Sequence, residues 1–246
     1  MGAAVGAAMT GTRPIVEMRF SDFALCAVDE LVNQAAKARY MFGGQGRVPM
    51  VIRMPIGLWS GSAAQHSQSL EAWFAHIPGL VVVTPATPQD NYSLLRAAIE
   101  CGDPVIYMEH KELWGLQGEV ASEPEILGRA RVMRQGKDLS LVTWSRTLHA
   151  ALEAKTSKSV EIIDLRTLWP WDRETVFASV KKTGRLLVVH EAVQAAGFGA
   201  EIAATVAEEL GVPVKRLAAP RIPVGYSKPL EDEARITAER IAAVVD

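Results

Sequence analysis

Short apolar runs alternate with helical patterns along almost the whole chain, and this alternation constrains the fold more than any other feature. In the first half, runs typical of buried strands occupy residues 50–54, 80–84 and 105–108. Helical patterns fall between them, including one that starts at Thr87-Pro88 with a Thr cap and Pro at the first helical position. Strands separated by helices run parallel with helical crossovers, so the sequence predicts an α/β fold.

A stretch of weak periodicity divides the chain into two parts. Residues 115–137 carry charges and glycines with little apolar pattern, and the alternation resumes at residue 139. We therefore expect one α/β domain at residues 1–118, a linker at 119–137 and a second α/β domain at 138–246. The expected helices lie at residues 23–40, 70–77, 148–155, 173–182, 200–210 and 231–244.

The composition argues against two classes of protein. The 246 residues are 22% charged with a formal net charge of -2, so the chain lacks the basic surface that nucleic acid requires. No apolar run approaches the roughly 20 residues that a membrane helix needs. Cys26 and Cys101 are far apart and form no CxxC pair, which fits a reducing cytoplasm. We expect a cytoplasmic protein without nucleic-acid or membrane partners.

His66 is the residue whose setting best suits chemistry. It follows a loop of small residues at 61–64 and precedes a predicted helix whose apolar positions include Leu70 and Trp73. The positive end of that helix would favour a neutral imidazole, which can accept or donate a proton. The alternative is that His66 is a hydrogen-bonded loop residue. The other histidines show no metal-ligand spacing, and His190-Glu191 falls at the carboxyl end of a predicted strand, where ligands bind in open α/β sheets.

Six segments resemble one enzyme family in the family's own order. They read GAAMTGTRPIVEMRFSDF, AAQHSQSLEAWFAHIPGLVVVTP, DPVIYMEHKELWG, DLRTLWPWDRETV, KTGRLLVVHEAVQAAGFGAEIA and YSKPLEDE. Together they resemble the β subunits of thiamine-diphosphate-dependent 2-oxoacid dehydrogenases. These are the decarboxylating first components of the pyruvate, branched-chain and acetoin complexes.

The resemblance implies a fold, a reaction and partners. The fold would be α/β, with a truncated pyrimidine-binding thiamine-enzyme domain followed by a transketolase C-terminal-like α/β domain. The reaction would be oxidative decarboxylation of a 2-oxoacid with acyl transfer to a lipoyl group on an acyltransferase core. No GDG…N word is present, so Mg²⁺ and the diphosphate of thiamine diphosphate would be held by an α subunit in an α2β2 heterotetramer.

The resemblance also implies roles for individual residues. His66, in the QHSQ word, would lie near the reacting carbon of the cofactor and assist proton transfer. Phe23, in the EMRFSDF word, would stack on the aminopyrimidine ring. The VHEA word at His190-Glu191 would make a contact between domains and not take part in catalysis. Backbone carbonyls expected to hold a structural K⁺ belong to Met50, Ala98, Ile99, Cys101 and Asp103. The alternatives are that Phe23 opens the apolar face of its helix and that these carbonyls form a plain helix end.

The N-terminal segment leaves the activity of the chain open. The family's acid that contacts the aminopyrimidine lies just before the GAAVGAAM word, and Glu17 comes after that word. We expect either that the start codon has been placed too late or that the chain is a truncated paralogue, acting as a non-catalytic assembly subunit. Half of a split transketolase or deoxyxylulose-phosphate synthase is a further alternative, against which the QHSQSLEAWF word argues.

Overall fold

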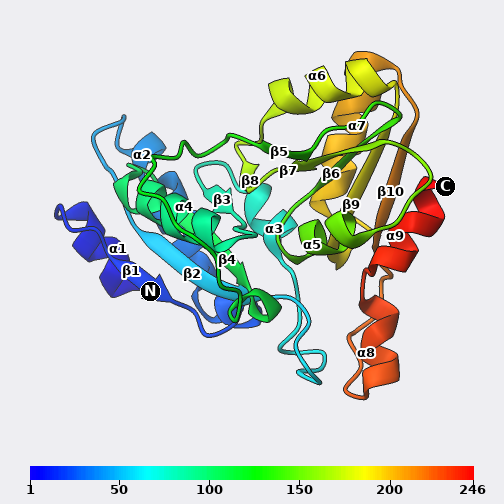
Figure 1. Ribbon diagram of the computed structural model, residues 1–246. Coiled ribbons are helices and arrows are strands. Elements are labelled where there is room, and N and C mark those ends of the chain that lie inside the picture. The colour runs from blue at the N-terminus through cyan, green and yellow to red at the C-terminus, as the bar shows by residue number, and fades with distance from the viewer.

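A computed structural model describes all 246 residues as two five-stranded sheets packed side by side (Figure 1). The first sheet is parallel except for its last strand, which runs antiparallel to its neighbour. Its strands, in spatial order, are β1 (Ile15–Glu17), β2 (Val51–Ile56), β4 (Val105–His110), β3 (Val81–Val83) and β8 (Thr167–Trp169). The predicted α/β class is therefore confirmed.

The second sheet has the same number of strands and a similar plan. Only its edge strand β5 is antiparallel. Its spatial order is β10 (Val214–Ala219), β9 (Leu186–Val193), β6 (Leu139–Thr143), β7 (Val160–Asp164) and β5 (Arg131–Arg134). Strand β5 lies within residues 119–137, which the sequence predicted to be a linker, because its apolar pattern is too short to be recognised locally.

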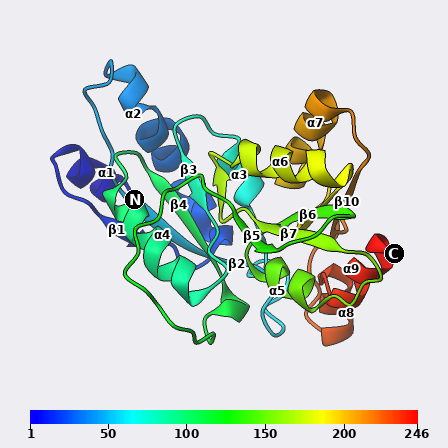
Figure 2. The ribbon, with the colours of Figure 1, turned by 45° about the horizontal axis from the view of Figure 1, so that its top comes forward.

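Helices cover both faces of each sheet (Figure 2). In the second half, α6 (Arg173–Thr183) and α7 (Phe198–Leu210) pack on one face, while α5 (Arg146–Glu153) and α9 (Ala238–Val245) pack on the other. In the first half, α4 (Pro88–Glu100) covers one face and α1 (Gly2–Met9), α2 (Ala36–Met41) and α3 (Glu71–Ala75) the other. No helix has the length and apolar character needed to cross a membrane.

The structure confirms the predicted start of one helix and divides two other predicted helices into shorter elements. Thr87 accepts the N–H of Asp90 at 3.1 Å with Pro88 at the start of α4, so the predicted cap is confirmed. The single helix expected at 231–244 is two, α8 (Lys228–Ala234) and α9, because Thr237 caps a new start. The helix expected at 23–40 is a 3₁₀ turn (Ser21–Ala27), a π-helical turn (Glu30–Ala35) and then α2.

Strand β8 joins the two halves into one body. It comes from the second half of the chain but adds to the first sheet, where Thr167 pairs with Val83 and Trp169 with Val82 of β3. Arg166, just before it, is 97% buried and pairs with Asp90 on α4 and with Glu125 at 2.9 Å. The largest apolar cluster likewise contains side chains from both halves.

Arg166 should be essential to this junction. Replacing it with Met removes the buried one of the two guanidinium groups that meet Asp90 and Glu125, the other being that of Arg131. We expect Arg166→Met to lower the free energy of unfolding by about 3–5 kcal/mol. Arg173→Met, which removes an exposed ion pair with Glu209, should cost less than about 1 kcal/mol. Urea unfolding measures both, and equal effects would contradict this account of the junction.

Candidate functional site

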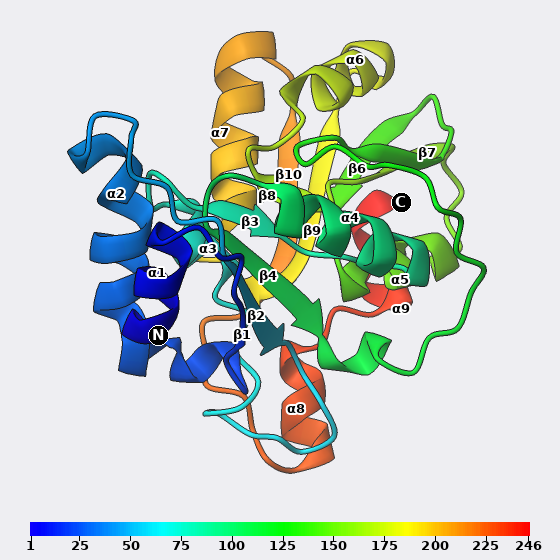
Figure 3. The same cartoon turned by 90° about the vertical axis from the view of Figure 1, so that its left-hand side faces the viewer.

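The carboxyl ends of β1, β2 and β4 bring three segments together at one edge of the first sheet. Residues 20–23 follow β1, the loop of residues 57–70 follows β2, and Lys111 follows β4 directly. Figure 3 shows the arrowheads of β2 and β4 pointing toward the end of the molecule where α8 lies. In open parallel sheets this edge is where ligands bind.

His66 lies against two phenylalanine rings at this edge. Its ring centroid is 4.9 Å from that of Phe20 and 5.4 Å from that of Phe23, both edge-to-face. The two phenylalanine rings contact each other at 5.7 Å. The structure therefore brings the predicted His66 and Phe23 together. Phe20 was missed, although it lies in the same EMRFSDF word and its aromatic type was the available signal.

The loop that carries His66 differs from the prediction. Helix α3 begins only at Glu71, with Leu70 as an N-cap that makes no side-chain hydrogen bond. The prediction that His66 stands at a helix N-terminus is therefore wrong, and the helix dipole does not act on its ring. The backbone carbonyl of Gln68 instead accepts hydrogen bonds from Gly57 N–H and Ser21 Oγ, and residues 67–70 form no helix.

Contacts from outside the loop fix its path. Gln68 Nε2 donates to Asp22 Oδ1 at 2.8 Å, and Gly61 N–H donates to Glu231 Oε1 of α8 at 2.9 Å. Lys111 Nζ donates to the backbone carbonyl of His66. The path of the loop is thus set by side chains of both halves of the chain.

A buried carboxylate of the second half holds the ends of β2 and β4. Glu191 Oε1 accepts the N–H of Leu58 and Nε2–H of His110, each at 2.8 Å. His110 Nδ1 accepts the N–H of Glu112, so its proton sits on Nε2. Burial by itself raises the pKa of Glu191, but His110, the Leu58 N–H and Arg146 hold that pKa below its usual value. The predicted domain contact at His190-Glu191 is confirmed for Glu191.

His190 belongs to the core. Its ring stacks on Trp144 with a centroid distance of 5.0 Å, and burial lowers the pKa of His190 to about 4. Trp144 Nε1 donates to Glu71, whose pKa is raised by burial. Gly197 and Gly199 leave the room that this ring fills, because a Cβ at either position would fall 2.7 Å from it. These groups seal the contact between the halves and do not face His66.

The five residues predicted to bind K⁺ through their carbonyls lie near the C-terminal end of α4. Arg13 Nη1 donates to the carbonyls of Ile99 at 2.6 Å and Cys101 at 3.0 Å. The carbonyl of Met50 accepts the N–H of Val105, and Asp103 pairs through its carboxylate with Arg39 at 2.5 Å. Ala98 is buried within the helix. A guanidinium of the chain therefore already contacts two of the five carbonyls.

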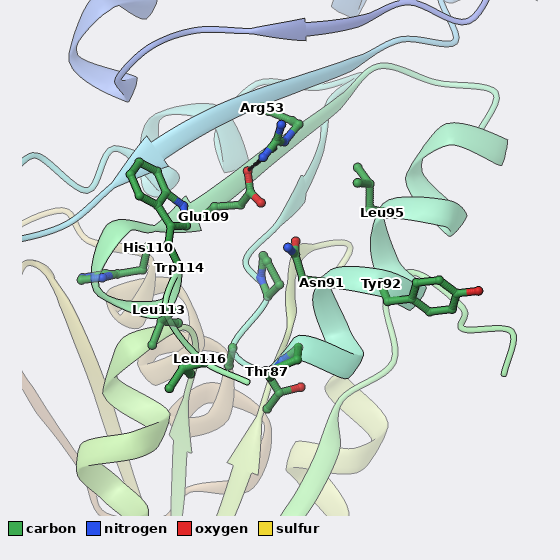
Figure 4. A pocket seen from close by; sticks show the side chains of 13 residues that line it. Arg53, Thr87, Asn91, Tyr92, Leu95, Glu109, His110, Leu113, Trp114 and Leu116 are labelled. Atoms are coloured by element: carbon green, nitrogen blue, oxygen red, sulfur yellow. Dashed lines mark hydrogen bonds and ion pairs between the residues drawn. The ribbon is translucent and has the colours of Figure 1, made fainter. Parts of the chain in front are cut away.

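A cavity of about 600 Å³ lies beside α4 (Figure 4). Arg53 and Glu109, which form an ion pair of 2.7 Å, line it together with Trp114 and Tyr92. Neither His66 nor Phe23 lines it. The cavity is therefore separate from the aromatic site, the name used below for His66, Phe20 and Phe23.

The comparisons with known proteins define the class of the chain. Residues 1–117 match the transketolase pyrimidine binding domain, and residues 128–241 match the transketolase C-terminal domain. A split gene transketolase, solved as an inactive beta4 tetramer, has the same fold, with a TM-score of 0.84 and 23% identity over 100% of this chain and 78% of that chain. The two domains are thus those of transketolase-like thiamine-diphosphate-dependent enzymes.

Closer relatives define the family within this class. The β subunits of acetoin:2,6-dichlorophenolindophenol oxidoreductase from Cupriavidus necator and Bacillus subtilis are 47% and 42% identical, over 99% of this chain and 75% of each relative. The 2-oxoisovalerate dehydrogenase β subunit of Bacillus subtilis is 39% identical over 99% of this chain and 79% of the relative. The chain belongs to the β-subunit family of thiamine-diphosphate-dependent 2-oxoacid dehydrogenases, as its sequence motifs predicted.

The charge of Glu191 should contribute to stability only where it is ionised. Because its pKa is lowered in the fold, its contribution is complete above the unfolded value of 4.5 and is lost as the pH falls through the lower folded value. We expect Glu191→Gln to lower the free energy of unfolding at pH 7 by about 1–3 kcal/mol. The deficit should shrink below pH 4.5.

Urea unfolding between pH 3 and 8 measures this dependence. Glu233→Gln, at an exposed side chain of α8, is the matched control and should have no pH-dependent deficit. A deficit of Glu191→Gln that stays constant across this range would contradict the role of the charge.

Proposed function

We propose that this chain is the β subunit of a 2-oxoacid dehydrogenase first component and provides the pyrimidine half of a thiamine diphosphate site. The reaction is the oxidative decarboxylation of a 2-oxoacid such as pyruvate or a branched-chain 2-oxoacid, or the corresponding oxidative cleavage of acetoin, with acyl transfer to a lipoyl group. The contact of His66 with Phe20 and Phe23, at the ligand-binding edge of the pyrimidine-binding domain, carries the proposal. The identity of 39–47% to the relatives supports it.

The aromatic site fits a flat, uncharged ring. Phe23 is 36% exposed while its edge contacts are made within the site, so it can still take a planar partner by offset stacking. This fits the aminopyrimidine end of thiamine diphosphate. When bound, the cofactor supplies the nucleophilic carbon to which the 2-oxoacid adds.

His66 serves this reaction as the group that moves a proton. Its imidazole is half-buried, and the edges of two phenylalanine rings limit its rotation. An imidazole is the side chain best suited to donate and accept a proton near neutral pH. Its neighbours Phe20 and Phe23 also exclude water from one side of the imidazole.

An α subunit is the partner that completes the site. We propose that it holds Mg²⁺ and the diphosphate, because no cluster of three His, Cys, Asp or Glu side chains in this chain could hold a metal ion. An α2β2 heterotetramer would also cover large exposed aromatic side chains, and the lipoyl acyltransferase core would dock on that assembly. These side chains include Tyr40, Phe42, Trp59, Trp73 and Trp114. Cys26 and Cys101 are both free, which suits the cytoplasm.

Two other functions compete with this one. A non-catalytic assembly subunit would keep the α-subunit contacts without turnover. Half of a split transketolase would share both domains, but its 23% identity speaks for the fold alone. Assays of this chain and of one extended upstream of Met1, each with an α subunit, separate the first alternative from a catalytic subunit. Testing whether a lipoyl group or a sugar phosphate serves as the acceptor separates the split transketolase from a 2-oxoacid dehydrogenase.

Loss of the His66 imidazole should abolish most of the turnover. We expect His66→Ala, assembled with an α subunit, to lower kcat about 10²- to 10⁴-fold in a decarboxylation assay with an artificial electron acceptor. His76→Ala, at an exposed position on the end of α3, is the matched control and should retain the activity. Unchanged turnover in a fully assembled His66→Ala enzyme would refute the role of this residue.

The K⁺ expectation becomes a proposal about Arg13. We propose that its guanidinium takes the place of a K⁺ ion, since it already donates to the carbonyls of Ile99 and Cys101. In Arg13→Gln these carbonyls lose their cation, so the free energy of unfolding should fall by about 1 kcal/mol in sodium buffer and recover in potassium buffer. Thermal unfolding of the unmodified chain should be equal in the two salts. A stabilisation of the unmodified chain by K⁺ alone would contradict the substitution.

A further inference from the structure

Lys111 is a buried lysine that contacts the aromatic site. The residue is only 2% exposed, although it lies in a short turn (Lys111–Leu113) directly after β4. Its Nζ lies 4.8 Å from the centroid of the Phe20 ring and donates to the backbone carbonyl of His66. Lysine is rarely buried to this extent without an anionic partner, so this arrangement calls for a reason.

The ammonium has no such partner. No carboxylate lies within ion-pair distance of Nζ, and the carbonyl of His66 is its hydrogen-bond acceptor. The nearby carboxylates each meet another donor: Glu191 accepts from His110, Glu112 pairs with Arg146 and Arg235, and Asp22 accepts from Gln68. The second oxygens of Asp22 and Glu191 have no partner, and Lys111 does not pair with them either. A buried ammonium in this setting costs stability, which argues against a purely structural role.

The turn that carries Lys111 is fixed on both sides. His110, the preceding residue, is bound to Glu191. Glu112, the following residue, accepts from Arg146 at 3.0 Å and from Arg235 at 2.8 Å. The ammonium is therefore held at a rigid point of the fold. The His66 loop is irregular by comparison, with left-handed backbone at Ser60 and Ala63.

We propose that Lys111 is a positioning residue that fixes the backbone of His66, and with it the imidazole, against Phe20 and Phe23. The proposal rests on the proposed function only for its catalytic consequence. The hydrogen bond from Lys111 Nζ to the carbonyl of His66, called the tie below, is itself a contact within this chain. A displacement of about 1 Å at a reacting group can cost on the order of 100-fold in rate, so one hydrogen bond to the His66 carbonyl is enough to matter.

The tie should depend on pH. Burial lowers the pKa of Lys111 to about 8, and the carboxylates of Asp22, Glu191, Glu231 and Glu112 offset part of that effect. These carboxylates come from the turn after β1, from β9, from α8 and from the turn of Lys111 itself. Above pH 8 the neutral amine still reaches the carbonyl but donates a weaker hydrogen bond, so the loop should loosen.

The same pKa fixes the sign of the effect on stability. Because the unfolded chain binds this proton more tightly than the folded chain, the penalty of the buried ammonium is complete below pH 8. The penalty is relieved as the pH rises from 8 toward 10.5. Replacing Lys111 with Met at pH 7 therefore should not lower the Tm, whereas a structural lysine would lower it.

Hydrogen exchange of the isolated chain tests the tie without any activity. In Lys111→Met at pH 7, amides of residues 57–70 should exchange at least about tenfold faster, with an unchanged or higher Tm. Lys37→Met is the matched control, because Lys37 Nζ donates to the carbonyl of Pro78 far from the site. In the unmodified chain, protection of the loop, corrected for intrinsic exchange, should fall above pH 8. Lys111→Arg, which keeps its charge, should retain it.

The turnover of the chain assembled with an α subunit is the second test of the role of Lys111. Lys111→Met should lower kcat about 10- to 100-fold with little change in KM for the 2-oxoacid. Unchanged exchange of the loop, or a lowered Tm with faster exchange throughout the chain, would overturn the proposal. If the exchange results hold but the unmodified assembly shows no turnover, the proposed function fails and the tie between Lys111 and His66 stands.

Discussion

The carboxylate of Glu191 is the interaction on which the rest of the site depends. It projects from the second half of the chain and accepts hydrogen bonds from Leu58 and His110, the residues that follow or end β2 and β4. A buried charge is costly unless such donors meet it, so the two halves can close only in the register that brings these groups together. Gly57 makes the approach possible, because a Cβ there would lie 2.0 Å from the His110 ring.

This closure explains how an irregular loop can hold His66, the side chain that we propose for proton transfer, in a fixed position. The path of residues 57–70 is set by Glu191, by Glu231 of α8 and by Lys111, and two of these three come from the second half. The pyrimidine-binding domain therefore supplies the site residues, while the C-terminal domain supplies much of the rigidity. Preorganisation of this kind is what a proton-transfer group requires, since its rate depends on position more than on affinity.

The sequence predicted the parts of this arrangement that are local. Periodicity located most strands, the Thr87 cap and the helices α5, α6 and α7 of the second half, and six sequence segments identified the family. It failed where distant groups decide the structure. Strand β8 pairs with β3 of the other half, Gly57 and Ser21 hydrogen-bond to Gln68 in the segment before α3, and Arg13 reaches carbonyls 86 and 88 residues away. No local pattern records such pairings.

The most direct test of the account is a structure of this chain with an α subunit and thiamine diphosphate. The account predicts that the aminopyrimidine ring stacks on Phe23 and that the His66 imidazole, still against Phe20 and Phe23, faces the reacting carbon of the cofactor. Lys111 should still donate to the carbonyl of His66. A cofactor bound elsewhere, or an aromatic site filled by side chains of the partner, would contradict the assignment of this edge of the sheet as the active site.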